Sequence, residues 1–404
     1  MIRGLPILMI GTADWDAPLW TNQQHLASRL AAAGNDIVFV ESLGLRRPRA
    51  GRRDVARLAR RLVRGLRRSR PAGERIRVVS PLVLPLHGFA PVRALNERIL
   101  LWTIRAELRR SSFRHPVLWA FSPGAAPLVG RLGERLVLYH CVDEYAAVPG
   151  IPSAVASFER SLLARADLVV TTSRALYESK RQQNARRTVY EPNVADAEHF
   201  ARARDPRTPR AAEMAGLPRP VLGFVGALDD YKVDAAIIEA LAGAFPLGTI
   251  VLIGPLGLAD AGTACASVTR LPNVRWLGPR PYAKVPEYMA SFDACLIPYR
   301  MNDYTRGVFP MKFYEALATG KPVVATRLPS LAGMEHVARL VLGPAAFVDA
   351  VRASLAEETP EKAALRVAES DRNSWSARLE SLSERVQEAL FEREARGHAT
   401  RSAI

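Results

Sequence analysis

Short apolar runs alternate with amphipathic stretches along nearly the whole of this 404-residue chain, and this alternation constrains its fold more than any other feature. Residues 5–10 and 36–41 are compact aliphatic runs typical of buried strands. The stretch 20–33 between them has helical periodicity and ends before Gly34. Strands that alternate with helices build parallel sheets with helices on both faces. The sequence therefore predicts an α/β protein, and its 49% hydrophobic content is ample for a core.

Two such series are expected, one in each half of the chain. The first half predicts further helices at 92–110 and 153–165, and further strands at 76–80, 116–119, 135–139 and 168–172. The second half predicts a last helix at 373–393, and strands at 221–225, 249–253, 274–276, 294–297, 322–325 and 340–342. The stretch 191–220 is polar and contains five prolines, so it is predicted to connect two doubly wound domains.

Positive charge is concentrated in one segment of the first half. Residues 46–77 contain 14 arginines and two acids, which is +12 of the chain's net +16. Apolar residues follow helical spacing on one side of 54–68. The other side carries the arginines Arg57, Arg60, Arg61, Arg64, Arg67 and Arg68.

This arrangement favours a helix that lies on an anionic membrane surface, because no acids balance its arginines. A solvated helix that covers the core is the first alternative. Nucleic acid is a weaker alternative, since no aromatic residues interleave the arginines and no recognised binding motif surrounds them. We therefore expect a membrane contact through 54–68 and no nucleic-acid partner.

Cysteine usage and hydropathy indicate the compartment. The three cysteines are widely spaced and form no metal or disulfide pattern, which suits a reducing cytoplasm. The chain starts with a strand-like run and no basic-then-apolar leader, and no apolar run is long enough to cross a bilayer. We expect a cytoplasmic protein that associates peripherally with the inner face of the cell membrane.

The most informative motif lies in residues 309–326. Lys312 and Glu315 are three residues apart on a predicted helix, so they share one face. Gly320 follows as a helix stop, and the next buried strand begins at 322. Lysine can neutralise a diphosphate and glutamate can accept hydrogen bonds from ribose hydroxyls, which suits a nucleotide sugar. Taken alone, the pair would be read as an ordinary surface salt bridge.

A wider pattern in the second half of the chain favours the first reading. Pro310-x-Lys312-x-x-Glu315 and the Ala-x-Gly-Lys-Pro-Val-Val run after it resemble the donor motif of retaining GT-B glycosyltransferases of family 4. The resemblance continues in order through 192–196, 223–226, 273–278, 286–288 and 292–299.

The resemblance implies the GT-B fold, in which two Rossmann-like, doubly wound domains face a cleft. Residues 1–195 would form the acceptor domain, and a C-terminal helix at 373–395 would pack back on it. Residues 196–372 would form the nucleotide-sugar donor domain.

The resemblance also implies which residues bind the donor. Lys312 would balance the charge of the leaving diphosphate and Glu315 would bind ribose. Gly226 ends a strand where the backbone can approach a phosphate closely, while Lys232, a few residues further on, is expected to be solvated. The other residues expected at the donor pocket are Tyr299, Asn302, Thr305, Arg280 and Tyr282.

One position departs from the family's pattern. The family has a further glutamate with seven residues between it and Glu315, and here that residue is Gly307. The missing carboxylate normally faces the donor sugar, so retention of configuration is not carried over. The Lys-x-x-Glu pattern also resembles bacterial glucuronosyltransferases, which invert with an aspartate base. For inversion, Asp143 is the candidate general base, and a capping role is its alternative.

Two loops of the first half are candidates for acceptor binding, because ligands of α/β sheets bind beyond the carboxyl ends of the strands. Gly11, Asp14 and Trp15 follow the first strand, and Trp15 would either stack on a sugar or cover the core. His140 lies in the loop that contains Asp143, as a second candidate base or as a structural residue.

The sequence has no paired histidine ligands and no Walker or Gly-x-Gly-x-x-Gly loop, so no metal or NAD cofactor is expected. The resemblance implies a metal-independent hexosyltransferase that uses a UDP- or GDP-sugar. Its acceptor would be lipid-linked or a polysaccharide, in cell-surface or exopolysaccharide synthesis. A GT-B nucleotide-sugar epimerase and a catalytically degenerate scaffold or sugar-binding subunit are the alternatives.

Overall fold

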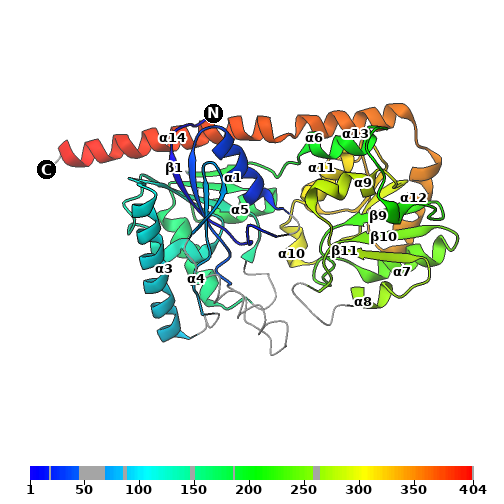
Figure 1. The fold of residues 1–404 in the computed structure, drawn as a ribbon, viewed down its shortest axis with the longest axis horizontal. Helices are drawn as coiled ribbons and strands as arrows, with labels where there is room; N and C mark the ends of the chain where they lie inside the picture. Colours follow the sequence, from blue (N-terminus) through cyan, green and yellow to red (C-terminus); the bar gives the residue numbers. More distant parts are fainter. Residues whose placement is uncertain are drawn as a thin grey trace. The chain divides into compact units, whose positions relative to one another are not determined.

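The computed structural model describes residues 1–17, 20–44, 69–84, 89–145, 151–184, 187–257 and 264–402. They form two compact α/β units (Figure 1). Unit 1 comprises Met1–Pro192 with Leu379–Ile404, and unit 2 comprises Asn193–Arg378. Each unit contains its own sheet, of eight and six strands respectively, so the α/β prediction is confirmed.

Unit 1 is built on a sheet with the strand order β3-β4-β2-β1-β5-β6-β7-β8. Its strands are β1 (Pro6–Ile10), β2 (Asp36–Val40), β3 (Arg70–Gly73), β4 (Ile76–Val79), β5 (Val117–Ala120), β6 (Leu136–Cys141), β7 (Leu168–Thr171) and β8 (Thr188–Tyr190). Its helices include α1 (Asn22–Ala32), α3 (Ala90–Arg110), α4 (Ala154–Arg165) and α5 (Arg174–Arg181). All neighbouring strands are parallel except the edge pair β3 and β4.

Unit 2 has the strand order β11-β10-β9-β12-β13-β14, and all its pairs are parallel. Its strands are β9 (Val221–Val225), β10 (Thr249–Ile253), β11 (Val274–Gly278), β12 (Ala294–Ile297), β13 (Val323–Thr326) and β14 (Arg339–Val341). Its helices are α6 (Ala197–Ala201), α7 (Ala235–Ala244), α8 (Cys265–Val268), α9 (Val285–Met289), α10 (Asp303–Arg306), α11 (Met311–Ala318), α12 (Pro344–Ala356) and α13 (Pro360–Arg372). Figure 1 shows α6, α9, α11 and α13 on one face of this sheet and α7, α8 and α12 on the other.

Both sheets reverse their strand order at one point, and this decides where ligands can bind. The reversal lies between β1 and β5 in unit 1, and between β9 and β12 in unit 2. At such a point the two following loops diverge to opposite faces and leave a crevice beyond the carboxyl ends of the strands. Every residue of β5, β6, β9, β10 and β12 is buried, as expected for strands covered on both faces.

The largest corrections to the predicted elements have local causes. The edge strand β3 was not predicted, because Arg-Pro-Ala-Gly has no apolar alternation. The helix predicted at 20–33 begins at Asn22, because Thr21 and Gln24 form a capping box. The last helix, α14, runs further than predicted, from Trp375 to Ser402.

The stretch 191–220 was predicted to be a connection between two domains, but most of it is part of unit 2. From Asn193 onward it belongs to unit 2, where α6 packs against α9 and α11. Phe200 and Met214 are its buried anchors in the core of that unit. Prolines and polar residues dominate this stretch. Its few buried apolar residues are therefore too far apart to give the hydrophobic periodicity from which a helix or strand is predicted.

The helix α14 contributes to both units. Its first residues, to Arg378, belong to unit 2, and the residues from Leu379 onward belong to unit 1. In unit 1, Ser381 donates to Glu191 at 2.6 Å, and Arg393 binds Asp167 and the carbonyl of Glu134.

Among the helices in the described ranges, none combines the length and the apolar character that a membrane span requires.

Candidate donor and acceptor sites

Lys312 and Glu315 form an ion pair on one face of α11. The lysine Nζ lies 2.9 Å from one carboxylate oxygen of Glu315 and 3.2 Å from the other. The Glu315 side chain is only 3% exposed, while that of Lys312 is 19% exposed. An ordinary surface salt bridge has two solvated partners, so that reading does not fit this pair. The lysine keeps one side open to an additional anionic partner.

The ends of α11 set the position of this pair. Phe309, just before the helix, accepts a hydrogen bond from Asn193 at 3.0 Å. At the other end Gly320 has φ +70°, the left-handed conformation that ends helices, and so the predicted helix stop is confirmed. The carbonyl of Gly320 accepts a hydrogen bond from Arg366 at 3.0 Å. Both ends of this short helix are therefore held by distant side chains.

His199 links Glu315 to the segment after β11. Its Nε2 donates to the carbonyl of Tyr282 at 3.0 Å, and the two rings stack with centroids 4.2 Å apart. Burial lowers the pKa of His199, while the hydrogen bond to Tyr282 and the charges of Asp196 and Glu315 act in the opposite direction. One histidine that the sequence did not single out thus binds the predicted donor residue Tyr282, and the charge of a second predicted donor residue, Glu315, raises its pKa.

Three neighbouring strands of unit 2 end in glycine. Gly226 and Gly254 follow β9 and β10, and Gly278 ends β11. Gly226 N–H donates to the carbonyl of Ile253 at 2.8 Å, and Gly254 N–H donates to the carbonyl of Gly278 at 2.9 Å. A Cβ on Gly254 would lie 1.9 Å from the carbonyl oxygen of Gly226, and φ is +144° there. A Cβ on Gly226 would lie 2.7 Å from the Phe224 ring. These close contacts explain why glycine is required in this glycine row, which lies at the carboxyl edge of the sheet, the edge where ligands of doubly wound sheets bind.

The loops after β9 and β12 are joined where the strand order reverses. Asn302 donates to the carbonyl of Tyr231 at 2.8 Å, and Arg300 N–H donates to the carbonyl of Lys232 at 2.8 Å. The Lys232 ammonium lies 5.7 Å from the centre of the Tyr304 ring and 5.9 Å from that of Tyr231. Lys232 is half-buried in this position, whereas the sequence predicted an ordinary solvated lysine.

Other predicted donor residues have structural partners in this loop region. Thr305 is fully buried, and its hydroxyl donates to the carbonyl of Arg300 at 2.5 Å, while Asn302 accepts from Thr305 N–H and caps α10. Tyr299 is buried with its ring edge toward Phe224. Gly307, at the position of the family's missing glutamate, is the C-cap of α10. These side chains shape the loop.

Arg280 is held away from the loop by other partners. Its Nε donates to the Tyr288 hydroxyl at 2.8 Å, and its Nη2 lies 3.2 Å from Glu213. Tyr288 and Arg280 both lower the pKa of Glu213, after a backbone hydrogen bond within that residue. The guanidinium of Arg280 therefore joins Tyr288 to Glu213, in the N-terminal part of unit 2. None of the hydrogen bonds described for this guanidinium goes to another predicted donor residue.

In unit 1 the loop after β1 is tightly built. A Cβ on Gly11 would lie 2.8 Å from the Phe39 ring and 3.0 Å from Gln23 Oε1, so only glycine fits. Gln23 accepts from Thr12 N–H at 2.8 Å and donates to the Thr12 hydroxyl at 2.6 Å. The backbone of the next residues is therefore fixed by α1.

The structure places Trp15 in the core of unit 1. Its ring centre is 5.1 Å from that of Phe39 and 5.8 Å from that of Trp20. The backbone N–H of Trp15 donates to the Glu41 carboxylate at 2.9 Å. Of the two readings of this tryptophan, burial favours the one in which it covers the core. Asp14 is half-buried beside it, with its carbonyl accepting from Gln24.

Tyr145 joins the two predicted acceptor loops. Its hydroxyl donates to the carbonyl of Phe121 at 2.8 Å and also hydrogen-bonds Thr12. Burial raises the pKa of Tyr145, and the charge of Asp143 adds to this. Asp143 therefore lies in the loop that meets the Gly11 loop where the strand order of unit 1 reverses. His140 is buried, stacks on Phe121 and accepts from Trp119 N–H at 3.3 Å, which favours its structural reading.

A buried ionic cluster adjoins the loop that contains Asp143. Lys180 Nζ is 2.8 Å from Glu144, which follows Asp143, and 3.3 Å from Glu159 on α4. Glu159 also accepts from the Tyr139 hydroxyl at 2.7 Å. Burial raises the pKa of Cys141 and Tyr139. Burial alone lowers the pKa of Lys180, but the charges around it, Cys141 and Glu159 first, raise it overall. The sequence did not reveal this cluster.

The remaining predicted contacts lie outside the described residues. Arg57, Arg60, Arg61, Arg64, Arg67 and Arg68 all fall between 45 and 68. The membrane contact predicted through 54–68 therefore stays a prediction.

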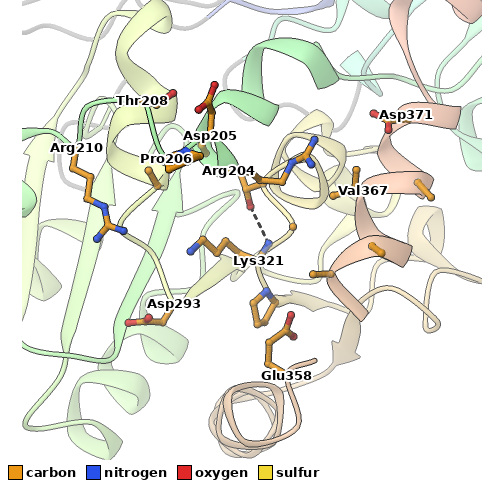
Figure 2. Close-up of a pocket in the computed structure, with 18 residues that line it drawn as sticks. Arg204, Asp205, Pro206, Thr208, Arg210, Asp293, Lys321, Glu358, Val367 and Asp371 are labelled. Carbon is orange, nitrogen blue, oxygen red and sulfur yellow. Dashed lines mark hydrogen bonds between the residues drawn. The ribbon is translucent and has the colours of Figure 1, made fainter. Parts of the chain in front are cut away.

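A pocket of about 900 Å³ lies elsewhere in unit 2, and none of the predicted donor residues lines it. Asp293 and Lys321, which precede β12 and β13, place it at the amino edge of the sheet (Figure 2). Three of its four carboxylates have arginine partners outside the lining set: Asp205 pairs with Arg207, Asp293 with Arg219, and Glu358 with Arg366. Ligands of doubly wound sheets bind at the opposite edge, so we assign the donor site by the glycine row.

All three cysteines, Cys141, Cys265 and Cys295, are buried free thiols. Burial raises the pKa of Cys295 to about 11. Within the described ranges, no group of three or more His, Cys, Asp or Glu side chains is placed to hold a metal ion.

Residues 219–357 match the family of glycosyl transferases group 1. Over 230 residues the chain is 32% identical to TuaH of Bacillus subtilis (strain 168), which is named as a teichuronic acid biosynthesis glycosyltransferase. This match covers 54% of the chain and 57% of TuaH, so the chain spans little more than half of the length of that relative.

Two solved structures resemble the whole chain. Sucrose-phosphate synthase from Thermosynechococcus elongatus aligns with a TM-score of 0.68 at 18% identity, over 96% of this chain and 99% of that one. HepE from Anabaena, solved in complex with UDP-glucose, aligns with a TM-score of 0.64 at 19% identity, over 95% and 100%. At these identities the likeness shows the fold. The chain therefore has the GT-B fold that the resemblance in the sequence predicted, and residues 219–357 of unit 2 carry the match to glycosyl transferases group 1.

Proposed function

We propose that this protein is a glycosyltransferase that moves a sugar from a nucleotide diphosphate onto a lipid-linked or polysaccharide acceptor. The single observation that carries the proposal is the Lys312–Glu315 pair, with its carboxylate buried and its lysine partly open, inside the group 1 domain. A ligand with a diphosphate and a ribose would use both groups.

The donor site of this proposal is the carboxyl edge of unit 2. The glycine row offers backbone to a phosphate, and Lys232 and Lys312 offer positive charge to the leaving diphosphate. Glu315 would exchange its hydrogen bonds from Lys312 for bonds from the ribose hydroxyls. We propose uridine as the base, with support from HepE, whose structure was solved with UDP-glucose.

Transfer requires an acceptor hydroxyl to attack the anomeric carbon of the donor. The bond from that carbon to the phosphate oxygen breaks, the diphosphate leaves with its charge, and the hydroxyl proton passes to a base. We propose Asp143 for this base and inversion as the outcome, because Gly307 has no carboxylate to offer at the donor sugar. The reaction as written needs no metal ion.

The acceptor is proposed from the kind of polymer that TuaH is named for, a cell-surface polysaccharide. A hexose donor and a lipid-linked acceptor at the cytoplasmic face of the membrane complete this proposal. The arginines of 54–68 would hold the protein on that anionic surface.

The test is release of UDP by the purified chain from a panel of nucleotide sugars, with thermal shift to find the donor that stabilises it. Lys312→Ala should lower turnover at least about 100-fold, the range found when a group that stabilises transition-state charge is removed. Lys362→Ala is the matched control, since this lysine also pairs with a glutamate in unit 2 but both are exposed. Equal activity of the two variants would refute the site.

Two alternatives give different results in the same assay. An epimerase would convert the sugar of the donor without release of UDP. A degenerate scaffold would show donor stabilisation but no turnover with any acceptor. The absence of a carboxylate at Gly307 supports the scaffold, and the buried Glu315 carboxylate paired with Lys312 supports the enzyme.

A further inference from the structure

The outer face of α3 in unit 1 carries large apolar side chains that no other described element covers. Trp102 is 70% exposed and Leu95 is 46% exposed. Phe89, the N-cap of this helix, is also exposed. The opposite face of α3 already anchors the helix, because Leu100, Ile104 and Leu108 belong to the core of unit 1. Figure 1 shows α3 in cyan at the outside of unit 1.

Leu95 and Trp102 belong to one exposed stripe along α3. Its members are spaced by three or four residues and therefore share a face. We call them the α3 stripe: Leu95, Arg98, Trp102, Arg105 and Arg109. Two further side chains, Ile99 and Ala106, are half-buried on its flank.

The α3 stripe contains arginine and no acid. The two acids of this helix point elsewhere: Glu107 is buried and pairs with Arg77 and Arg110, and Glu97 lies on the inner side beside a small apolar pocket. The guanidinium groups of Arg105 and Arg109 donate to the backbone carbonyls of Arg131 and Arg105. These bonds hold the side chains but do not neutralise their charge.

We propose that the α3 stripe is a docking surface for an anionic lipid membrane. Tryptophan and leucine at such exposure match the boundary between headgroups and acyl chains, and the arginines match the phosphates of the headgroups. A second copy of the chain fits less well, because a two-fold contact would set the arginines of one stripe against those of the other.

This inference rests on the membrane association in the proposed function and gives it a surface within the described residues. It does not depend on the catalytic part of that proposal. It also predicts a different kind of attraction from that of 54–68. Binding through arginines alone is screened by salt, whereas burial of Trp102 and Leu95 in lipid persists at high ionic strength.

The experiment is flotation of the full chain with vesicles of phosphatidylglycerol and phosphatidylcholine in equal parts, at low salt and at about 1 M salt. The test variant is Leu95→Ser with Trp102→Ser. The matched control is Leu247→Ser with Phe391→Ser, which removes two side chains that are at least as exposed but lie outside the stripe. Thermal unfolding should be the same for both, since no core contact is lost.

The test variant should bind at least about tenfold more weakly than the control at both salt concentrations. Arg98→Gln with Arg109→Gln should weaken binding at low salt only. Equal binding by test and control variants would overturn the proposal. So would a native dimer in sedimentation that Trp102→Ser converts to monomer, which would assign the stripe to self-association. If the stripe variant loses vesicle binding while the unchanged chain releases no UDP from any donor, the membrane proposal stands and the catalytic proposal fails.

Discussion

Each unit contains a lysine that is bound to buried carboxylate, and the two sites differ in how closed they are. In unit 1, Lys180 is 3% exposed and is shared by Glu144 and Glu159. In unit 2, Lys312 is bound to Glu315 alone and is 19% exposed. The first lysine is enclosed, while the second is partly exposed to solvent. The same two residue types therefore serve stability in one unit and suit ligand binding in the other.

The first prediction, with the largest expected effect, concerns the closed cluster. Lys180→Met should lower the free energy of unfolding by about 3–5 kcal/mol, because it leaves two carboxylates without their buried cation. Lys312→Met should cost less, about 1–3 kcal/mol, because it leaves one carboxylate without its cation and not two. Urea unfolding of both variants measures the difference. A similar loss for both would break the comparison.

The second prediction extends the comparison to a further open lysine. Lys232→Ala should lower kcat/KM for the nucleotide sugar by about 10- to 100-fold, because a charge beside the proposed diphosphate site is lost. Its effect on the free energy of unfolding should stay below about 1 kcal/mol, the range of a half-exposed cation–π contact. Steady-state kinetics and urea unfolding give the two numbers. A stability loss without a kinetic effect would place Lys232 among structural residues.

The third prediction compares the carboxylates through amide variants of nearly the same shape. Glu315→Gln should raise KM for the nucleotide sugar by about tenfold, because the amide is a weaker acceptor for ribose hydroxyls than the carboxylate. Glu144→Gln should leave that KM unchanged and should destabilise the chain by about 1 kcal/mol, since the ammonium of Lys180 then donates to a neutral amide oxygen and no longer to a carboxylate. An unchanged KM for Glu315→Gln would remove the ribose assignment.

The fourth prediction has the smallest effect and tests the link between Glu315 and His199. Because burial lowers the pKa of His199, the unfolded chain binds a proton first as the pH falls through about 6.5. Stability should therefore decrease in that range, and His199→Gln should make the decrease shallower. In Glu315→Gln the pKa of His199 should be lower still, since the glutamate charge raises it. Urea unfolding at several pH values measures the stability, and titration of the histidine ring protons by NMR measures the pKa. An unchanged pKa in Glu315→Gln would contradict the influence of the Glu315 charge on His199.

Local sequence carried most of the information about the fold. The alternation of strands and helices, the stop at Gly320 and the shared face of Lys312 and Glu315 depend on neighbours three or four residues away. These were predicted from the sequence and are present in the structure. The edge strand β3 escaped prediction because edge pairing needs no apolar pattern.

The candidate sites were predicted less completely, because their contacts join distant parts of the chain. Asn302 meets the carbonyl of Tyr231 across 71 residues, and this contact helps to build the loop that holds Lys232. His199 reaches Tyr282 across 83 residues. The sequence named Asn302 and Tyr282 as donor residues, but nothing in the local pattern indicates their contacts with Tyr231 and His199.

The sequence by itself determined that the chain is α/β, that it has the spacing of a GT-B donor motif, and that Lys312 and Glu315 share a helix face. These properties follow from backbone periodicity, which is local. Only the tertiary structure decided that Glu315 is buried and Lys312 partly open, that Trp15 belongs to the core, and that Lys180 is enclosed by two carboxylates. Burial depends on which other segments fold over a side chain, and that is a property of the whole unit.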